Sequence, residues 1–158
     1  MSNQVQKPKI LVAREISPDL LAQLEQVADV QSNQDDLIWS AADLKAAMAD
    51  KDAAIVTGGE RVDADIIAAS PNLKIVSNIA VGYNNFDMPA FKARQVMATN
   101  TPDVLTETTA DFGFTLLMAT ARRLTESERW LRAGQWKKFS ICDTPLAMDI
   151  HHSTLGIM

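Results

Sequence analysis

The chain has 158 residues, 47% of them hydrophobic and 22% charged, and a formal net charge of −5. These values are typical of a globular domain that buries a sizeable core. The acidic balance argues against a nucleic-acid partner, because no Lys/Arg stripe is present to neutralise phosphates. No apolar run approaches the roughly 18 residues that a membrane helix needs, so we expect no membrane partner.

The N-terminal segment and the cysteine content indicate the compartment. Residues 1–10 carry no apolar stretch after their charges, so we expect no secretory signal. Cys142 is the single cysteine and cannot form an internal disulfide, which favours a reducing, cytoplasmic setting. No activating base follows or precedes it closely, and we interpret it as a small packing residue.

Short apolar runs alternate with helical patterns over the first hundred residues. The apolar runs predict strands at residues 9–13, 29–31, 53–56, 73–79 and 96–99. The patterns between them predict helices at residues 18–27, 41–48, 63–69 and 89–94, with Ser17 and Ser40 as N-caps of the first two. This alternation predicts an α/β fold with a parallel sheet covered on both faces. Five strands indicate a flavodoxin-like domain that ends near Pro102.

Ligands of such sheets bind beyond the carboxyl ends of the strands. The loops after Ala13, Val56 and Ile79 lie at that edge, and two of them contain glycine. We therefore expect the ligand site at these loops.

The character of the sequence changes after Pro102. Residues 106 to about 133 predict one long helix or two abutting helices. Its first half is apolar on every side, including Phe112 and Phe114, and such a helix is usually buried all round. Residues 154–158 then predict a new apolar strand that begins a second sheet. The chain offers little to bury either element, so we expect that something is missing or that a partner supplies it.

Residues 78–87, NIAVGYNNFD, are the most informative segment. Gly82 allows the backbone to approach a ligand closely, and successive N–H groups after a strand can form an anion-binding nest. The alternative interpretation is a plain strand-to-helix turn with Asn84 and Asn85 as turn residues.

Several motifs together resemble the D-2-hydroxyacid dehydrogenase family, in particular its glyoxylate/hydroxypyruvate reductase B and 2-ketogluconate reductase branch. They are residues 76–87, Thr101-Pro102, LTETTAD at 105–111, AGQW at 133–136 and DIHHSTLGI at 149–157. The resemblance covers essentially the whole chain. It implies a substrate-binding domain over residues 1–102. It also implies that residues 103–158 begin an NAD(P)-binding Rossmann domain with a long linker and dimerisation helix.

The resemblance also implies site residues. In that family the backbone of the matching segment binds the substrate carboxylate, which implies this role for Ala80, Val81 and Gly82. The loop matching Thr57-Gly58 lies beside the same pocket. Leu105 and Thr109 match positions that touch the dinucleotide. The alternative for Thr109 is a helical threonine that bonds its own backbone.

The implied reaction is the reduction of a small 2-oxo acid (glyoxylate, hydroxypyruvate or 2-ketogluconate) by NADPH or NADH, in a homodimer formed through residues 106–152. The family holds the pyrophosphate with a Gly-x-Gly-x-x-Gly turn, which this sequence lacks. Its catalytic arginine, glutamate and histidine lie beyond the matched motifs. We therefore expect no catalytic residue, little or no cofactor binding and no turnover by this chain alone. The alternatives are a non-enzymatic binding or dimer-partner module, and an enzyme reconstituted from two chains.

Other candidate groups have simpler interpretations. The doublet His151-His152 does not share one face of a regular element, so we expect neither a catalytic role nor a metal site. Glu107 and Asp111 lie one helical turn apart and could share a face, but near a helix start they complement the helix dipole. Trp130 and Trp136 are expected at the dimer interface.

Overall fold

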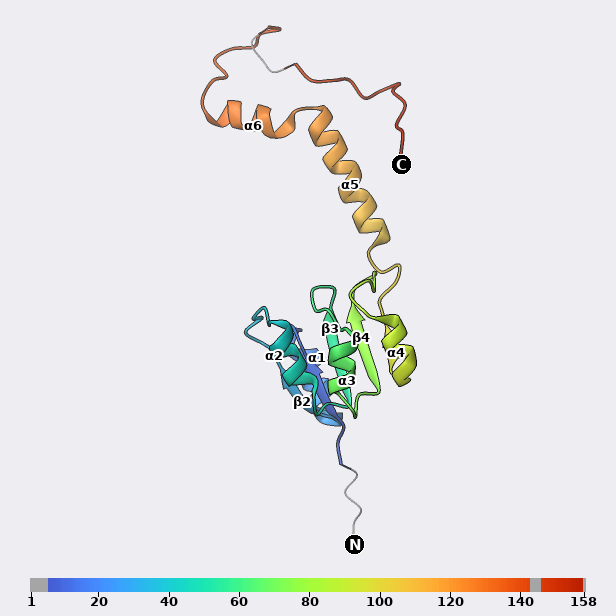
Figure 1. Cartoon of the computed structure of the whole chain (residues 1–158). Coiled ribbons are helices and arrows are strands. Elements are labelled where there is room, and N and C mark those ends of the chain that lie inside the picture. Colours follow the sequence, from blue (N-terminus) through green and yellow to red (C-terminus); the bar gives the residue numbers. More distant parts are fainter. Residues whose placement is uncertain (1–5, 143–145, 158) are drawn as a thin grey trace. The chain divides into compact units, whose positions relative to one another are not determined.

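The computed structural model describes residues 6–142 and 146–157, and the chain divides into two units, Met1–Val104 and Leu105–Met158. The first unit contains a five-stranded sheet with a helix in each connection (Figure 1). Its strands are β1 (Lys9–Val12), β2 (Asp29–Ser32), β3 (Ala53–Thr57), β4 (Ile75–Ile79) and β5 (Met97–Thr99). Its helices are α1 (Pro18–Val27), α2 (Ala41–Met48), α3 (Ala64–Ala69) and α4 (Met88–Arg94).

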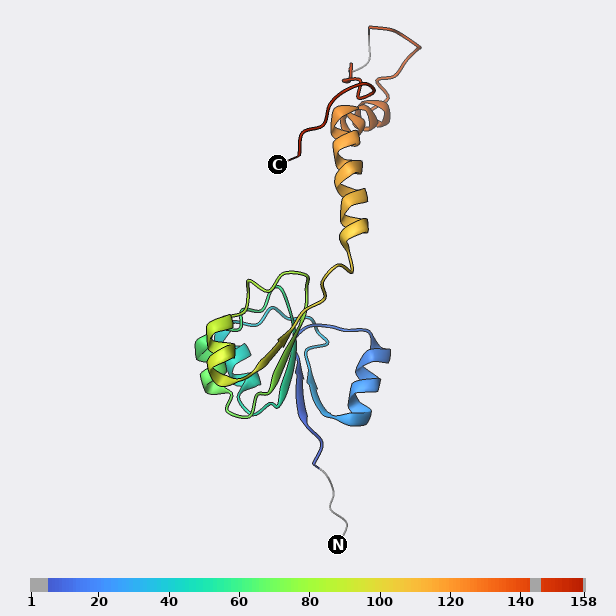
Figure 2. The ribbon, with the colours of Figure 1, turned by 90° about the vertical axis from the view of Figure 1, so that its right-hand side faces the viewer.

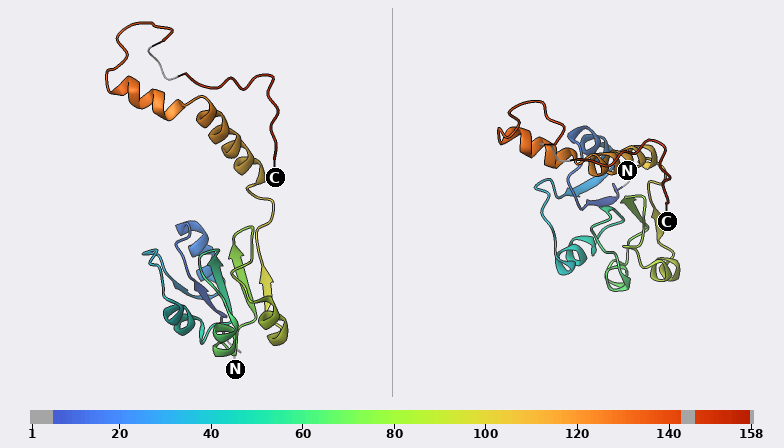
Figure 3. Two further views of the ribbon diagram at one scale, coloured as in Figure 1. Left: turned by 45° about the horizontal axis from the view of Figure 1, so that its top comes forward. Right: turned by 90° about the horizontal axis from the view of Figure 1, so that it is seen from above.

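All strand pairs are parallel, and the strand order is β2-β1-β3-β4-β5. This is the flavodoxin-like order, so the predicted α/β fold and parallel sheet are confirmed. The first connection runs from β1 outward to β2, whereas the later connections run toward β5 in the opposite direction. Because parallel crossovers share one hand, this reversal places α1 on one face of the sheet and the other three helices on the other face. Figure 2 and the right panel of Figure 3 show this division.

The hydrophobic core lies mainly on the face covered by α2, α3 and α4. Side chains that alternate along the strands, such as Leu11, Val56 and Val76, are buried against Met48 and Phe91 of the helices. The opposite face is thinly covered, because α1 has no buried residue. A groove of about 380 Å³ is left there. Its lining is mostly apolar and comprises Ile16, Leu20, Gln23, Leu24, Ile55, Ser77, Asn78, Ile79, Thr99, Asn100 and Thr101.

The two predicted serine caps differ in what they contribute. The Asp43 N–H donates to Ser40 Oγ (3.2 Å), and the Ser40 N–H donates back to Asp43 Oδ2 (3.1 Å), which closes a capping box. The hydrogen bonds from Ser40 lower the pKa of the Asp43 carboxyl. Ser17 occupies the N-cap position of α1, but its side chain makes no capping bond there. Pro18, which has no N–H to satisfy, follows it directly.

The second unit contains two helices, α5 (Thr106–Ala121) and α6 (Leu124–Arg132), so the alternative of one long helix is wrong. Arg123 has a φ of 51°, a left-handed conformation that no helix can propagate. The two arginines at the break bind a returning segment: Arg122 Nη1 lies 2.8 Å from Asp149 Oδ1, and Arg123 Nη1 donates to Leu146 O (3.1 Å). These contacts stabilise the bend.

The predicted strand at residues 154–158 is not observed over 154–157, and Met158 lies outside the described residues. A strand requires a neighbour that accepts and donates its ladder hydrogen bonds, and no strand is present in the described part of the second unit. Cys142 is exposed, so its interpretation as a packing residue is wrong. No described helix combines the length and apolar character that crossing a membrane requires.

Replacing Ser40 by Ala is expected to lower the free energy of unfolding of the first unit by about 1 kcal/mol, because an N–H of α2 loses its acceptor. Native-state hydrogen exchange at the β1 and β3 amides measures this change. Ser17→Ala is the matched control, since Ser17 makes no capping bond, and its effect should stay well below that of Ser40→Ala. Equal effects of the two substitutions would contradict the assignment of the capping box.

Candidate functional site

Two of the predicted loops lie side by side at the carboxyl edge of the sheet. A Cβ atom built on Gly58, after β3, would lie 3.6 Å from the Cβ of Ala80, after β4. Because adjacent parallel strands end at the same edge, the loop at residues 57–60 forms one side of the loop at residues 80–82. The structure thus brings together the residues that the sequence assigned to the substrate.

The carbonyls of the loop Ala80–Gly82 are all bound by neighbouring residues. The Thr101 N–H donates to Ala80 O (3.0 Å), and Asn100 Nδ2 donates to Val81 O (2.8 Å). Asn78 Nδ2 donates to Gly82 O (2.9 Å). These bonds fix the orientation of three successive peptide groups.

The amides of Val81 and Gly82 donate no hydrogen bond within residues 6–142 and 146–157. Both residues are exposed, so two adjacent N–H donors are available to an anion. Neither residue has a positive φ, so Gly82 is not needed for a left-handed conformation. A Cβ there would lie 3.2 Å from Asn84 Oδ1, a tight contact that a small shift of the exposed Asn84 side chain would relieve.

A pair of asparagines ties this loop to the turn after β3. Asn85 Nδ2 donates to Thr57 O (3.1 Å) and to Glu60 O (2.9 Å). Its Oδ1 accepts from Asn78 Nδ2 (3.0 Å), and Asn78 is only 2% exposed. The alternative interpretation of Asn85 as an ordinary turn residue is therefore incomplete, since its side chain joins two loops.

The polar groups of Thr57 are bound within its own turn. Thr57 N and Thr57 Oγ1 both donate to Glu60 Oε2, each at a distance of 2.8 Å. Thr57 therefore does not offer a free donor in this arrangement, while Gly58 is exposed at the edge. The sequence-based interpretation missed Glu60, Asn78 and Asn100. Their signal was available: Asn78 and Asn100 stand at the carboxyl ends of two strands, and Glu60 follows Thr57 at turn spacing.

The predicted cofactor residues lie in the second unit. Leu105 is the N-cap residue of α5 and makes no side-chain capping bond. The Thr109 N–H donates to Leu105 O (2.9 Å), and the Thr109 hydroxyl makes no hydrogen bond in the described part of the chain. The alternative role, a hydroxyl bound to its own helix, is seen instead at Thr115, which donates to Asp111 O (2.8 Å). Both Leu105 and Thr109 are exposed.

Metal chemistry finds no support in the described residues. No group of three or more His, Cys, Asp or Glu side chains converges there. His151 and His152 stack edge to face with ring centroids 5.1 Å apart and are exposed.

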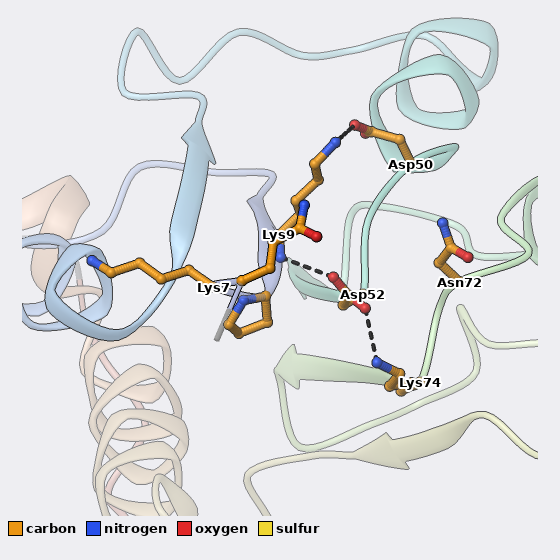
Figure 4. Close-up of a pocket in the computed structure, with 8 residues that line it drawn as sticks. Lys7, Lys9, Asp50, Asp52, Asn72 and Lys74 are labelled. Carbon is orange, nitrogen blue, oxygen red and sulfur yellow. Dashed lines mark hydrogen bonds and ion pairs between the residues drawn. The ribbon is translucent and has the colours of Figure 1, made fainter. Parts of the chain in front are cut away.

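A second hollow, of about 370 Å³, lies at the opposite edge of the sheet (Figure 4). Lys9 Nζ lies 2.8 Å from Asp50 Oδ2, and Lys74 Nζ lies 2.9 Å from Asp52 Oδ1. Hydrogen bonds from Lys51 and Lys9 lower the pKa of Asp50 to about 2, and the bond from Lys74 lowers the pKa of Asp52. Each aspartate there is paired with a lysine, and the hollow lies at the amino ends of the strands, where parallel sheets do not bind their ligands. We therefore place the candidate site at the carboxyl edge.

Comparison with known proteins decides the family. Residues 10–144 match the family described as D-isomer specific 2-hydroxyacid dehydrogenase, catalytic domain. The chain belongs to this family. The resemblance drawn from the motifs is confirmed. The amides of Val81 and Gly82 and their supporting asparagines lie within the region that matches this catalytic domain.

Named relatives of this dehydrogenase chain include reductases of small oxo acids. A glyoxylate reductase of Thermococcus onnurineus is 41% identical over 155 residues, and glyoxylate/hydroxypyruvate reductase B of Yersinia pestis is 38% identical over 152 residues. Each match covers 96% of this chain and 46% of the relative. The chain thus spans about half the length of these curated relatives.

Solved structures agree with this assignment. The 2-hydroxyacid dehydrogenase of Ketogulonicigenium vulgare superposes with a TM-score of 0.70 at 30% identity, over 92% of this chain and 45% of that one. The NADPH-dependent glyoxylate/hydroxypyruvate reductase of Sinorhizobium meliloti, in complex with NADP and malonate, gives a TM-score of 0.67 at 37% identity. That match covers 83% of this chain and 40% of the reductase.

Replacing Asn85 by Ala is expected to lower the free energy of unfolding of the first unit by about 1–3 kcal/mol, because it leaves Glu60 O without a partner and removes one of the two hydrogen bonds of Thr57 O and of Asn78 Nδ2. Urea denaturation followed by the methyl NMR signals of Val56 and Val76 measures the loss. Asn84→Ala is the matched control: its side chain makes no hydrogen bond to a described residue, so a change within about 0.5 kcal/mol is expected. If Asn84→Ala lowers the free energy of unfolding as much as Asn85→Ala does, the hydrogen bonds by which Asn85 joins the two loops do not contribute to stability.

Proposed function

We propose that this chain forms the substrate-binding part of an NAD(P)H-dependent oxidoreductase that reduces small 2-oxo acids of the glyoxylate and hydroxypyruvate kind. One observation carries the proposal: the amides of the exposed residues Val81 and Gly82 donate no hydrogen bond to a described residue, whereas the carbonyls of the same loop are anchored. The names of the relatives support the substrate class.

The loop suits the carboxylate of a 2-oxo acid. Two adjacent N–H groups can each donate to a carboxylate oxygen, and charge-assisted hydrogen bonds of this kind are about twice as strong as neutral ones. The anchored carbonyls prevent the loop from turning its oxygens toward the anion. Binding the carboxylate in this way also directs the neighbouring keto group of the substrate, so the contribution of this chain is to bind and orient.

The residues of this chain do not form the turn that would hold the pyrophosphate of the cofactor. The dinucleotide, when bound, supplies the hydride that converts the keto group to a hydroxyl. Its pyrophosphate needs a glycine-rich turn at a helix start, and the six glycines of this sequence stand at no Gly-x-Gly-x-x-Gly spacing. Leu105 and Thr109 remain proposed contacts to the cofactor within a complete enzyme, and no chemical step is assigned to this chain alone. A reducing, cytoplasmic setting suits this proposed activity.

Malonate is the probe for the proposed site. Titrated into the ¹⁵N-labelled chain, malonate is expected to shift the Val81 and Gly82 amide signals saturably, with a Kd on the order of millimolar, as expected for two charge-assisted hydrogen bonds at an open loop. Malonamide, which has the same shape without charge, is the matched control and should produce much smaller shifts. No saturable shift at these two amides would refute the proposed site.

A second candidate function is that of a dimer partner, through the second unit. No residue of α5 is buried, and Phe112, at 61% exposure, lies with Phe114 and Leu116 among its exposed apolar side chains. Several large apolar side chains left exposed along one helix indicate an interaction site. We propose that α5 pairs with a second copy of the chain or with a longer relative.

Light scattering tests this pairing. The chain is expected to have twice its monomer mass of 17.3 kDa, and the double substitution Phe112→Ser/Phe114→Ser should return it to the monomer. Ile38→Ser, at an exposed apolar position of the first unit, is the control and should leave the mass unchanged. If the chain has the mass of a monomer, and this mass does not change on mixing with a full-length relative, this function is ruled out.

A further inference from the structure

The turn after β3 is closed by a carboxylate that belongs to the turn itself. Glu60 Oε2 accepts hydrogen bonds from both Thr57 N and Thr57 Oγ1, and the Glu60 N–H donates to Thr57 O (3.2 Å). The Gly59 N–H donates to Thr57 Oγ1 (3.3 Å). The side chain of Glu60 is only 11% exposed, so little of its charge is left to solvent.

Arg14 supplies the opposite charge. Its Nε lies 3.9 Å from Glu60 Oε1 and 2.9 Å from Asp36 Oδ1, and its Nη2 donates to Asp36 Oδ2 (3.1 Å). A mostly buried carboxylate is stable only with such a counter-charge or with hydrogen bonds, and Glu60 has both. Arg14 thereby joins the loops that follow β1, β2 and β3.

This turn is in direct contact with the proposed carboxylate site. Gly58 lies against Ala80, and Asn85 bonds both Thr57 O and Glu60 O while it accepts from Asn78. Asn78 in turn holds Gly82 O. A change in the turn at residues 57–60 would therefore affect the Val81 and Gly82 amides in two ways. One is the contact of Gly58 with Ala80, and the other is the chain of hydrogen bonds from Asn85 through Asn78 to Gly82 O.

We infer that Glu60, held by Arg14, is a positioning residue that fixes the Thr57–Glu60 turn against the carboxylate-binding loop Ala80–Gly82. The inference rests on the proposed function. Without Glu60, Thr57 would lose the acceptor of its N–H and of its hydroxyl. The two glycines between them would then leave the turn free to sample many conformations. A loop that must be ordered on binding binds its ligand more weakly than one already in place.

An electrostatic alternative makes the opposite prediction. Glu60 carries the same sign of charge as a carboxylate substrate, so pure repulsion would mean that removing its charge strengthens binding. Glu60→Gln removes the charge and keeps an oxygen acceptor for Thr57, whereas Glu60→Ala removes both. The two substitutions together separate positioning from repulsion.

The experiment is the malonate titration of the full chain, read at the Val81 and Gly82 amides. Glu60→Ala is expected to raise the Kd about tenfold, and Glu60→Gln to stay within about threefold of the unaltered chain. Hydrogen exchange of the Thr57 amide should speed up in Glu60→Ala and be restored in Glu60→Gln. Glu25→Ala, a glutamate whose carboxylate bonds no described residue, is the matched control and should leave both readouts unchanged.

The outcomes separate the two proposals. If the unaltered chain shows no malonate shift at Val81 and Gly82, the proposed function fails and this inference fails with it. If the unaltered chain binds and Glu60→Ala binds equally well or more tightly, the proposed function stands and the positioning role is overturned. Should Glu60→Ala not fold, Arg14→Gln is used instead: a severalfold rise in Kd is expected, and an unchanged Kd overturns the inference.

Discussion

A parallel sheet leaves the last backbone groups of its strands without ladder partners at one edge, and buried or half-buried peptide groups there need other partners. In this chain side chains from the same edge supply them. Asn78 and Asn100 bind the carbonyls after β4, Asn85 binds those after β3, and Glu60 binds the Thr57 amide. The rest of the site depends on these hydrogen bonds, because they decide which backbone groups remain for a ligand.

Because the side chains bind the loop carbonyls and leave two loop amides, this edge is suited to an anion. Carbonyl oxygens and amide hydrogens alternate along any loop, so a loop without fixed orientation offers both signs of partial charge. Here the carbonyl oxygens of Ala80, Val81 and Gly82 are bound by protein, whereas the amide hydrogens of Val81 and Gly82 meet no acceptor among the described residues. In the proposed site the carboxylate is therefore bound by backbone amides that neutral side chains orient.

The sequence predicted the parallel sheet well, because continuous apolar runs and caps such as Ser40 are local signals. It could place Ala80, Val81 and Gly82 at a ligand edge for the same reason. It could not predict contacts between distant residues, such as Asn85 with Thr57 or Arg14 with Glu60, since these depend on strand order.

The second unit was harder to predict for a related reason. Its predicted helical pattern extends through residues 106–133, yet the left-handed Arg123 ends one helix and the next begins beyond it. Residues 154–157 have the composition of a strand without the neighbour that makes one. Pattern alone indicates what a segment favours, whereas its contacts decide what it forms.

The two edge strands limit how the first unit can associate. β2 is four residues long and exposes Asp29 and Gln31, and β5 has only three residues. Edges this short give a strand from another molecule few hydrogen bonds with which to extend the sheet. Extension of the sheet by strands from other molecules, the growth step of amyloid-like fibrils, is therefore disfavoured at both edges of the fold.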